Sequence, residues 1–132
     1  MDQAYTHSDF VGFALDEFPE LRDDFESVTG MPTLYASIFA QRLQRAKGSA
    51  DWDSYARGIR LVERLWDSPD PALVRALRWG VMKGLDFDGP RGPVAWEYLN
   101  PELRRAWEST RKEIEALSAL PRKAKRQRGE RQ

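Results

Sequence analysis

The sequence predicts an all-α protein, organised as a single-domain bundle of five or six amphipathic helices with a central helix pair. Apolar residues recur at steps of three and four in several segments, which is the spacing of one helix face. Prolines and glycines separate these segments, and no segment shows a convincing strand pattern. A chain of 132 residues with 41% hydrophobic residues is one domain by size and can bury a core without disulfides.

The expected central pair spans residues 49–85. Its first helix has an apolar stripe with steps of 3, 4, 3 and 4: Trp52, Tyr55, Ile59, Val62 and Trp66. A helix with such a broad apolar surface must be covered on more than one side, which favours a central position. Pro69 ends this helix, and Asp70 is the expected N-cap of the next one.

Shorter segments precede this pair. Ser8 is the expected N-cap of a helix over about 9–18, and a second helical segment, 19–29, is expected to end at Gly30 in a left-handed cap. A third helix is predicted over 32–47. Arg42 falls inside its apolar arc, so we expect its stem to cover apolar surface while its head reaches water, in preference to pairing with a buried carboxylate.

The second helix of the pair covers 71–85, with an apolar face of Leu73, Val74, Leu77, Val81 and Leu85. At 100° per residue, Trp79 points away from this face, in the company of Arg75, Met82 and Ala72. The favoured explanation is that a second layer of the same protein covers Trp79. The alternative is that Trp79 and Arg75 anchor a partner, since Trp and Arg dominate binding hot spots.

The segment 86–93 contains two Gly-Pro pairs and is predicted to be a loop. Asp86, Asp88 and Gly89 match the opening of a calcium-binding loop, but the remaining ligands are absent, so no metal site is predicted. A helical turn is expected over 94–99.

The last helix is expected to begin with Asn100 as N-cap and Pro101 as first residue. Its apolar stripe is narrow and fits an outer helix. Residues 1–120 are thus the predicted helical domain, and 121–132 a basic tail that should be disordered in the free protein.

Charge is distributed unevenly along the chain although the formal net charge is zero. Residues 1–30 carry eight acids and Arg22, a sum of −7, whereas 121–132 carry six bases and one acid, a sum of +5. The acids that we consider for docking a basic partner are Asp16, Glu17, Glu20, Asp23 and Asp24. The other interpretation of these acids is a solvated face that favours the positive ends of helix dipoles.

The sequence gives little support for catalysis. The chain has no cysteine, and its single histidine, His7, excludes a His cluster for a metal and leaves a Ser-His-Asp triad without an evident centre. No glycine-rich phosphate loop follows a strand. We therefore expect a protein that is not an enzyme and needs no cofactor. The start of the chain lacks the pattern of a signal peptide and no apolar run could span a bilayer, so we expect a cytoplasmic location without membrane contact.

Three segments resemble a known family: DFVGFALDEFPELRDDFE, LVERLWDSPDPALVRALRWGVMKGL and YLNPELRRAWE. Together they are similar to small, all-helical, largely uncharacterised bacterial proteins of the immunity type. The resemblance extends over roughly residues 9–110. It implies neutralisation of a toxin by binding, and it carries over no catalytic residues.

Three hypotheses follow. The first is an immunity or antitoxin protein that occludes a cognate toxin, through the acidic residues above or through Trp79 with Arg75. The second is a nucleic-acid or ribosome-associated protein that uses the basic tail, with the candidate residues Arg122, Lys123, Lys125, Arg126 and Arg128. The third is an inhibitor or regulator of a phage or host defence protein. Self-association through an exposed Trp79 also stays open.

Overall fold

The structure, a computed structural model, describes residues 5–131, with side chains described as far as Ala119. In chain order its elements are α1 (His7–Glu17), the 3-10 turn η1 (Pro19–Leu21), α2 (Arg22–Glu26), α3 (Pro32–Gly48), α4 (Trp52–Leu65), α5 (Pro71–Ala76), the π-helical segment η2 (Leu77–Met82), α6 (Gly92–Glu97) and α7 (Pro101–Arg131). No strand occurs within residues 5–131, so the prediction of an all-α protein is confirmed. The same residues form seven α-helices where the sequence predicted five or six.

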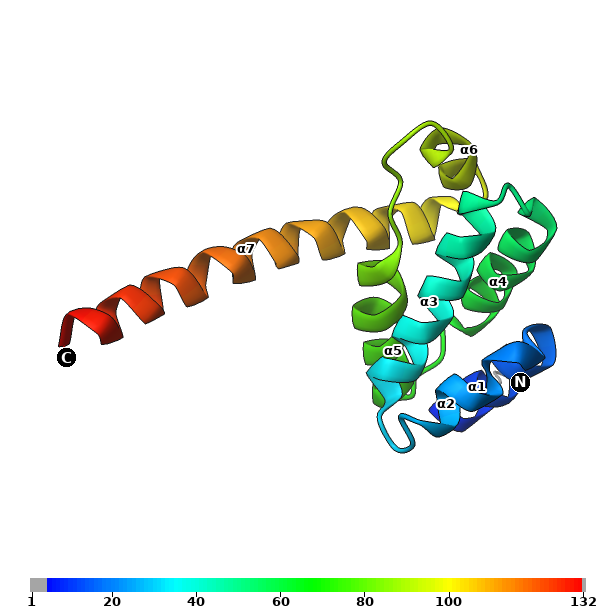
Figure 1. Ribbon diagram of the computed structural model, residues 1–132, viewed down its shortest axis with the longest axis horizontal. Helices are drawn as coiled ribbons and strands as arrows, with labels where there is room; N and C mark the ends of the chain where they lie inside the picture. The colour runs from blue at the N-terminus through cyan, green and yellow to red at the C-terminus, as the bar shows by residue number, and fades with distance from the viewer. Residues whose placement is uncertain (1–4, 132) are drawn as a thin grey trace.

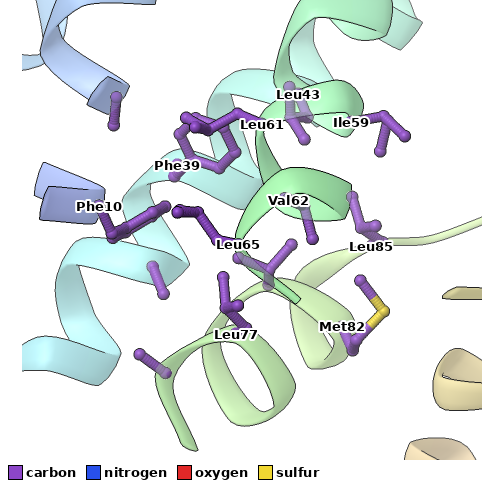
Figure 2. Packing of buried hydrophobic residues seen from close by; sticks show 14 of the residues in the cluster. Phe10, Phe39, Leu43, Ile59, Leu61, Val62, Leu65, Leu77, Met82 and Leu85 are labelled. Atoms are coloured by element: carbon purple, nitrogen blue, oxygen red, sulfur yellow. The ribbon is translucent and has the colours of Figure 1, made fainter. Parts of the chain in front are cut away.

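The helix that contacts the largest number of others is α3. It packs against α1, α2, α4, α5 and η2, and its most extensive contact is with η2 (Figure 1). The core lies around it, and Figure 2 shows side chains from α1, α3, α4, η2 and the segment after η2 meeting there: Phe10, Phe39, Leu43, Ile59, Leu61, Val62, Leu65, Leu77, Met82 and Leu85. The predicted helix pair within 49–85 is therefore not the centre of the fold. Both of its members pack against α3, which takes that position.

Small residues allow α3 to approach closely the helix that consists of α5, η2 and residues 83–84. A Cβ atom added at Gly80 would lie 2.3 Å from the Cβ of Ala36, and one added at Gly84 would lie 2.7 Å from the Cβ of Ala40. Both distances are shorter than real Cβ contacts, so only glycine fits at positions 80 and 84 without a shift of the backbone. Two Gly–Ala contacts, four residues apart on each helix, thus set the spacing of the two helices.

The π-helical segment changes which residues are buried. A π-helix has i→i+5 hydrogen bonds and hence more residues in each turn than an α-helix. The spacing of 100° per residue that placed Met82 beside Trp79 on the outer side therefore fails beyond Leu77. Met82 is fully buried in the structure, which corrects that prediction.

Val74 is a second correction. It was predicted on the apolar face, but 44% of its surface is exposed. The buried side of this helix includes the small residues Ala76 and Gly80, and Gly80 lies against Ala36 of α3. Burying these two positions rotates the helix so that Val74 lies at its rim.

The first helix starts two residues earlier than the sequence predicted. Thr6, rather than Ser8, is the N-cap of α1. Its hydroxyl accepts a hydrogen bond from the Asp9 amide, and the Asp9 carboxylate accepts one from the Thr6 amide at 2.8 Å. This reciprocal arrangement is a capping box, which satisfies two amides that have no partner within the helix.

The turn between α4 and α5 holds the start of α1. Asp70 is the N-cap residue of α5, as predicted, but no hydrogen bond from its own helix reaches its side chain. The carboxylate instead accepts a hydrogen bond from the backbone amide of His7 at 3.1 Å. The Ser68 hydroxyl donates to the backbone oxygen of Tyr5. Segments 63 residues apart in the chain are thereby fixed together.

The His7 imidazole packs against the ring of Tyr35, with 5.3 Å between ring centroids. Burial lowers the pKa of His7 below its ordinary value, because the charged form loses solvation. The Asp70 carboxylate and the backbone oxygen of Pro32 act in the opposite direction without reversing the shift. His7 is therefore accommodated best as a neutral group.

The last helix is tied to the body at its start. The Asn100 side-chain oxygen accepts a hydrogen bond from the Leu103 amide at 2.8 Å, which confirms Asn100 as the N-cap. The Asn100 side-chain nitrogen donates to Glu63 of α4 at 2.9 Å. The Trp107 indole donates to the backbone oxygen of Leu85 at 3.0 Å, so α7 crosses the end of the helix that contains η2.

In the structure α7 continues through Pro121 to Arg131, where the sequence predicted a helix end at Pro121. Figure 1 shows its second half extending away from the other helices. The domain boundary at residue 120 and the disorder of 121–132 stay predictions.

Replacement of Gly80 by alanine tests the close contact between α3 and η2. We expect Gly80→Ala to lower the free energy of unfolding by about 1–3 kcal/mol, because the new methyl group overpacks against Ala36. Gly12→Ala is the matched control, since a Cβ at Gly12 meets nothing within 4 Å. On the exposed side of α1 that change should stabilise the protein by about 0.5–1 kcal/mol. Urea denaturation measures both values, and equal effects of the two substitutions would contradict the proposed contact.

Titration of His7 tests its burial. Because the pKa is lower in the folded state, the unfolded chain binds the proton first as the pH falls. The stability that depends on neutral His7 is thus complete above about pH 6.5 and is lost as the pH falls through the folded pKa. NMR observes this imidazole without ambiguity, since the chain has one histidine. His7→Gln should weaken the pH dependence of unfolding between about pH 7 and pH 5. A measured pKa at or above the ordinary value would refute the assignment.

Candidate protein-binding surfaces

The predicted docking acids lie on consecutive elements at one end of the protein. We call them the acidic surface: Asp16 and Glu17 of α1, Glu20 of η1, and Asp23 and Asp24 of α2. Four of them are exposed and Glu17 is half-buried. In Figure 1 these elements lie on the opposite side of the body from the free end of α7. The acidic surface and the basic end of the chain are therefore well separated.

Glu20 forms an ion pair with Arg42 of α3. The distance from Arg42 Nε to Glu20 Oε2 is 2.7 Å, and the guanidinium lies over the Phe18 ring, 4.8 Å from its centroid. The Arg42 side chain is only 17% exposed, against 52% for Glu20. The hydrogen bond from Arg42 is the main reason why the pKa of Glu20 is lowered. Arg42 thus covers apolar surface, as expected, but its head binds a half-exposed carboxylate.

Glu17 forms a similar pair with Arg57 of α4, with 3.2 Å between Arg57 Nη1 and Glu17 Oε2. Arg57 also lies 3.4 Å from Asp53 and faces Phe18 from 5.7 Å. Phe18 is buried, and two arginines from different helices lie over its ring.

The acidic surface therefore has two parts. Glu17 and Glu20 are held by arginines of the same chain. Asp16, Asp23 and Asp24 form no ion pair with any other side chain in the described part of the protein. On the side of α4, a cleft next to Asp16 is also lined by Arg60 and Arg64, and on the side of α3 a cleft next to Asp24 is also lined by Arg45.

A second surface feature is a groove between the α5–η2 helix and α7. It encloses about 250 Å³ and is lined by Trp66, Val74, Leu77, Arg78, Ala106 and Ser109. We call it the α5–α7 groove. Arg78 Nη2 donates to Ser109 at 3.1 Å and to Glu113 at 2.5 Å, so the guanidinium is fixed against α7. The groove combines an apolar floor with one anchored cation.

The predicted contact pair, Trp79 and Arg75, is adjacent to this groove in the sequence but does not line it. Arg75 is exposed, whereas Trp79 is half-buried with the Arg78 guanidinium carbon 5.9 Å from its ring centroid. The tryptophan in the groove is Trp66, which the sequence placed in the apolar stripe of α4. Its position after the last turn of α4, beside the proline-rich turn, was the one sequence signal that could have identified it.

The alternative nucleic-acid residues have side chains outside the described part of the protein: Arg122, Lys123, Lys125, Arg126 and Arg128. Their role stays a prediction. Within the described residues, no group of three His, Cys, Asp or Glu side chains is arranged to hold a metal ion. The described part of the chain contains no helix with the length and hydropathy needed to cross a membrane.

These observations define an all-α protein whose candidate sites are a charged surface and a small apolar groove. The chain belongs to the family described as "Domain of unknown function (DUF7674)", which matches residues 13–115. No curated protein and no solved structure matches the chain. The family description carries no function, so the resemblance to immunity proteins supports a proposal only.

Two substitutions of Arg42 separate its two contributions. Arg42→Met keeps an unbranched apolar stem but removes the ion pair, and it should cost about 1 kcal/mol or less, because half-exposed pairs contribute little. Arg42→Ala also removes packing over Phe18 and should cost roughly 2 kcal/mol. Urea denaturation at neutral pH measures the difference. An equally large loss in the two variants would show that charge, not packing, dominates.

Proposed function

We propose that this protein is a non-catalytic binding module of the immunity or antitoxin kind, which occludes a basic partner with its acidic surface. The observation that carries the proposal is the set of exposed carboxylates of Asp16, Asp23 and Asp24, which have no ion-pair partner among the described side chains. Exposed carboxylates without an ion-pair partner can pair with a second protein, because no ion pair within the chain has to be broken first.

Ion pairs of the neighbouring acids hold the segment that carries these carboxylates in place, and this order favours tight binding. Arg42 of α3 and Arg57 of α4 connect the acidic segment to two other helices through Glu20 and Glu17. Phe18, between these two acids in the sequence, is buried under both guanidinium groups. A surface that is already ordered in the free protein loses less conformational entropy when it binds.

The proposed partner is a toxin that cleaves nucleic acid. An enzyme that binds a polyanion presents a basic surface to it. An acidic protein of complementary shape can cover that surface, and opposite charges accelerate association. The proposal includes a cytoplasmic location, where such a toxin would reach its substrate.

Charge reversal tests the role of the acidic surface. The tagged chain is purified from its native cell, and the protein that co-purifies is used in binding kinetics at two salt concentrations. Asp23→Lys with Asp24→Lys should slow association at low salt by about tenfold or more and reduce its salt dependence. The control is Glu102→Lys with Glu108→Lys, which changes the net charge equally at exposed positions of α7. Association as fast as that of the unmodified chain in the first double variant would refute the proposal.

A further inference from the structure

We propose that the α5–α7 groove binds an amphipathic helix of a partner protein, one that presents an apolar side chain next to a carboxylate. This site is separate from the acidic surface and does not rest on the function proposed for it. The two surfaces have opposite charge and lie on different helices, so they select different partner chemistry.

The apolar part of the groove fits side chains of a protein. Its volume of about 250 Å³ is below the roughly 300–1,000 Å³ of small-molecule sites. Val74 is 44% exposed at its rim, Trp66 is half-buried, and Leu77 and Ala106 complete the apolar lining. An apolar side chain placed here would cover Val74 and Trp66 together, and a central aromatic residue is the usual core of a binding hot spot.

The charge around the groove specifies an acidic partner. Residues 71–85 contain Arg75, Arg78 and Lys83 and no acid. Glu113 of α7 offsets one of these charges through its pair with Arg78. Arg75 and Lys83 are exposed and form no ion pair with a described side chain. The helix that forms one wall of the groove therefore presents a net positive surface.

The Arg78 guanidinium is fixed in place and still has unused donors with which it can bind a carboxylate. Both of its hydrogen bonds to described partners, Ser109 and Glu113, use Nη2. The donors on Nη1 and Nε are left for a ligand, and the guanidinium is already held in place. A fixed guanidinium loses little freedom on binding, and its remaining donors can each form a charge-assisted hydrogen bond to a carboxylate oxygen.

The geometry of the groove favours a helix over an extended strand. Its walls are two helices, α5–η2 and α7, and no sheet edge lies within residues 5–131 to which a strand could add. A groove between helices is the arrangement that accepts the apolar face of an amphipathic helix. Such a helix can place a carboxylate one turn from its apolar anchor, within reach of Arg78.

The test uses two synthetic helical peptides of equal length, one of leucine and glutamate and one of leucine and lysine, each with an amphipathic pattern. Each is titrated into the isotope-labelled full chain and followed by backbone amide shifts in NMR. The glutamate peptide should shift the amides of Val74, Leu77, Arg78, Ala106 and Ser109, and the lysine peptide should leave them unchanged. Shifts in Asp16–Asp24 with the lysine peptide would report on the acidic surface independently.

Matched variants locate the contact. Val74→Glu should weaken binding of the glutamate peptide by about tenfold or more, because an apolar contact of the groove is lost and a charge of the same sign as the peptide is gained. Val94→Glu is the control, because Val94 is 46% exposed and the change in net charge is the same. Arg75→Glu should also weaken binding. Unchanged melting temperatures establish that all three variants are folded.

Three results would overturn the proposal. The glutamate peptide could shift amides elsewhere on the protein, or Val74→Glu and Val94→Glu could have equal effects. The chain could also self-associate in light scattering at increasing concentration and lose this property in Val74→Glu, which would identify a second copy as the occupant of the groove.

Discussion

The close contact between α3 and η2 determines where the other elements lie. Gly80 and Gly84 allow the backbones to approach to a distance that any side chain would prevent. Because η2 is held in this way, its end is presented to α7, where the Trp107 indole binds the backbone oxygen of Leu85. The α5–α7 groove is the space left beside this crossing, so its shape follows from a contact that lies inside the protein.

Some cationic side chains of this protein bind groups of the same chain, whereas others have no such partner among the described residues. Only the second kind is free to bind another protein. Lys47 is nearly buried and donates to the backbone oxygen of Asp86 at 2.5 Å, and Arg111 donates to that of Lys83 at 3.1 Å. Both satisfy carbonyl groups near a helix end, where positive charge is favourable. Arg42 is likewise used internally. A net charge of zero therefore conceals which charges are free, and Asp23 is among the free acids.

The sequence predicted most elements but not their arrangement. Proline at position 32 and glycine at position 48 gave α3 its limits to within a residue, and Asn100 was correctly identified as a cap. Local signals of this kind depend on neighbours in the chain. The burial of Met82 depends instead on a π-helical turn and on small residues of another helix, and no periodicity reveals these. The groove escaped prediction for the same reason, since residues from three elements form it.

Hydrogen exchange of backbone amides under native conditions tests most directly whether α3 and η2 form one cooperative unit. The amides of Phe39, Leu43 and Val81 should exchange only through global unfolding, with a free energy of opening equal to the free energy of unfolding. Exchange of Val81 through a smaller, local opening, while Phe39 and Leu43 stay protected, would contradict this, because η2 could then detach without unfolding α3.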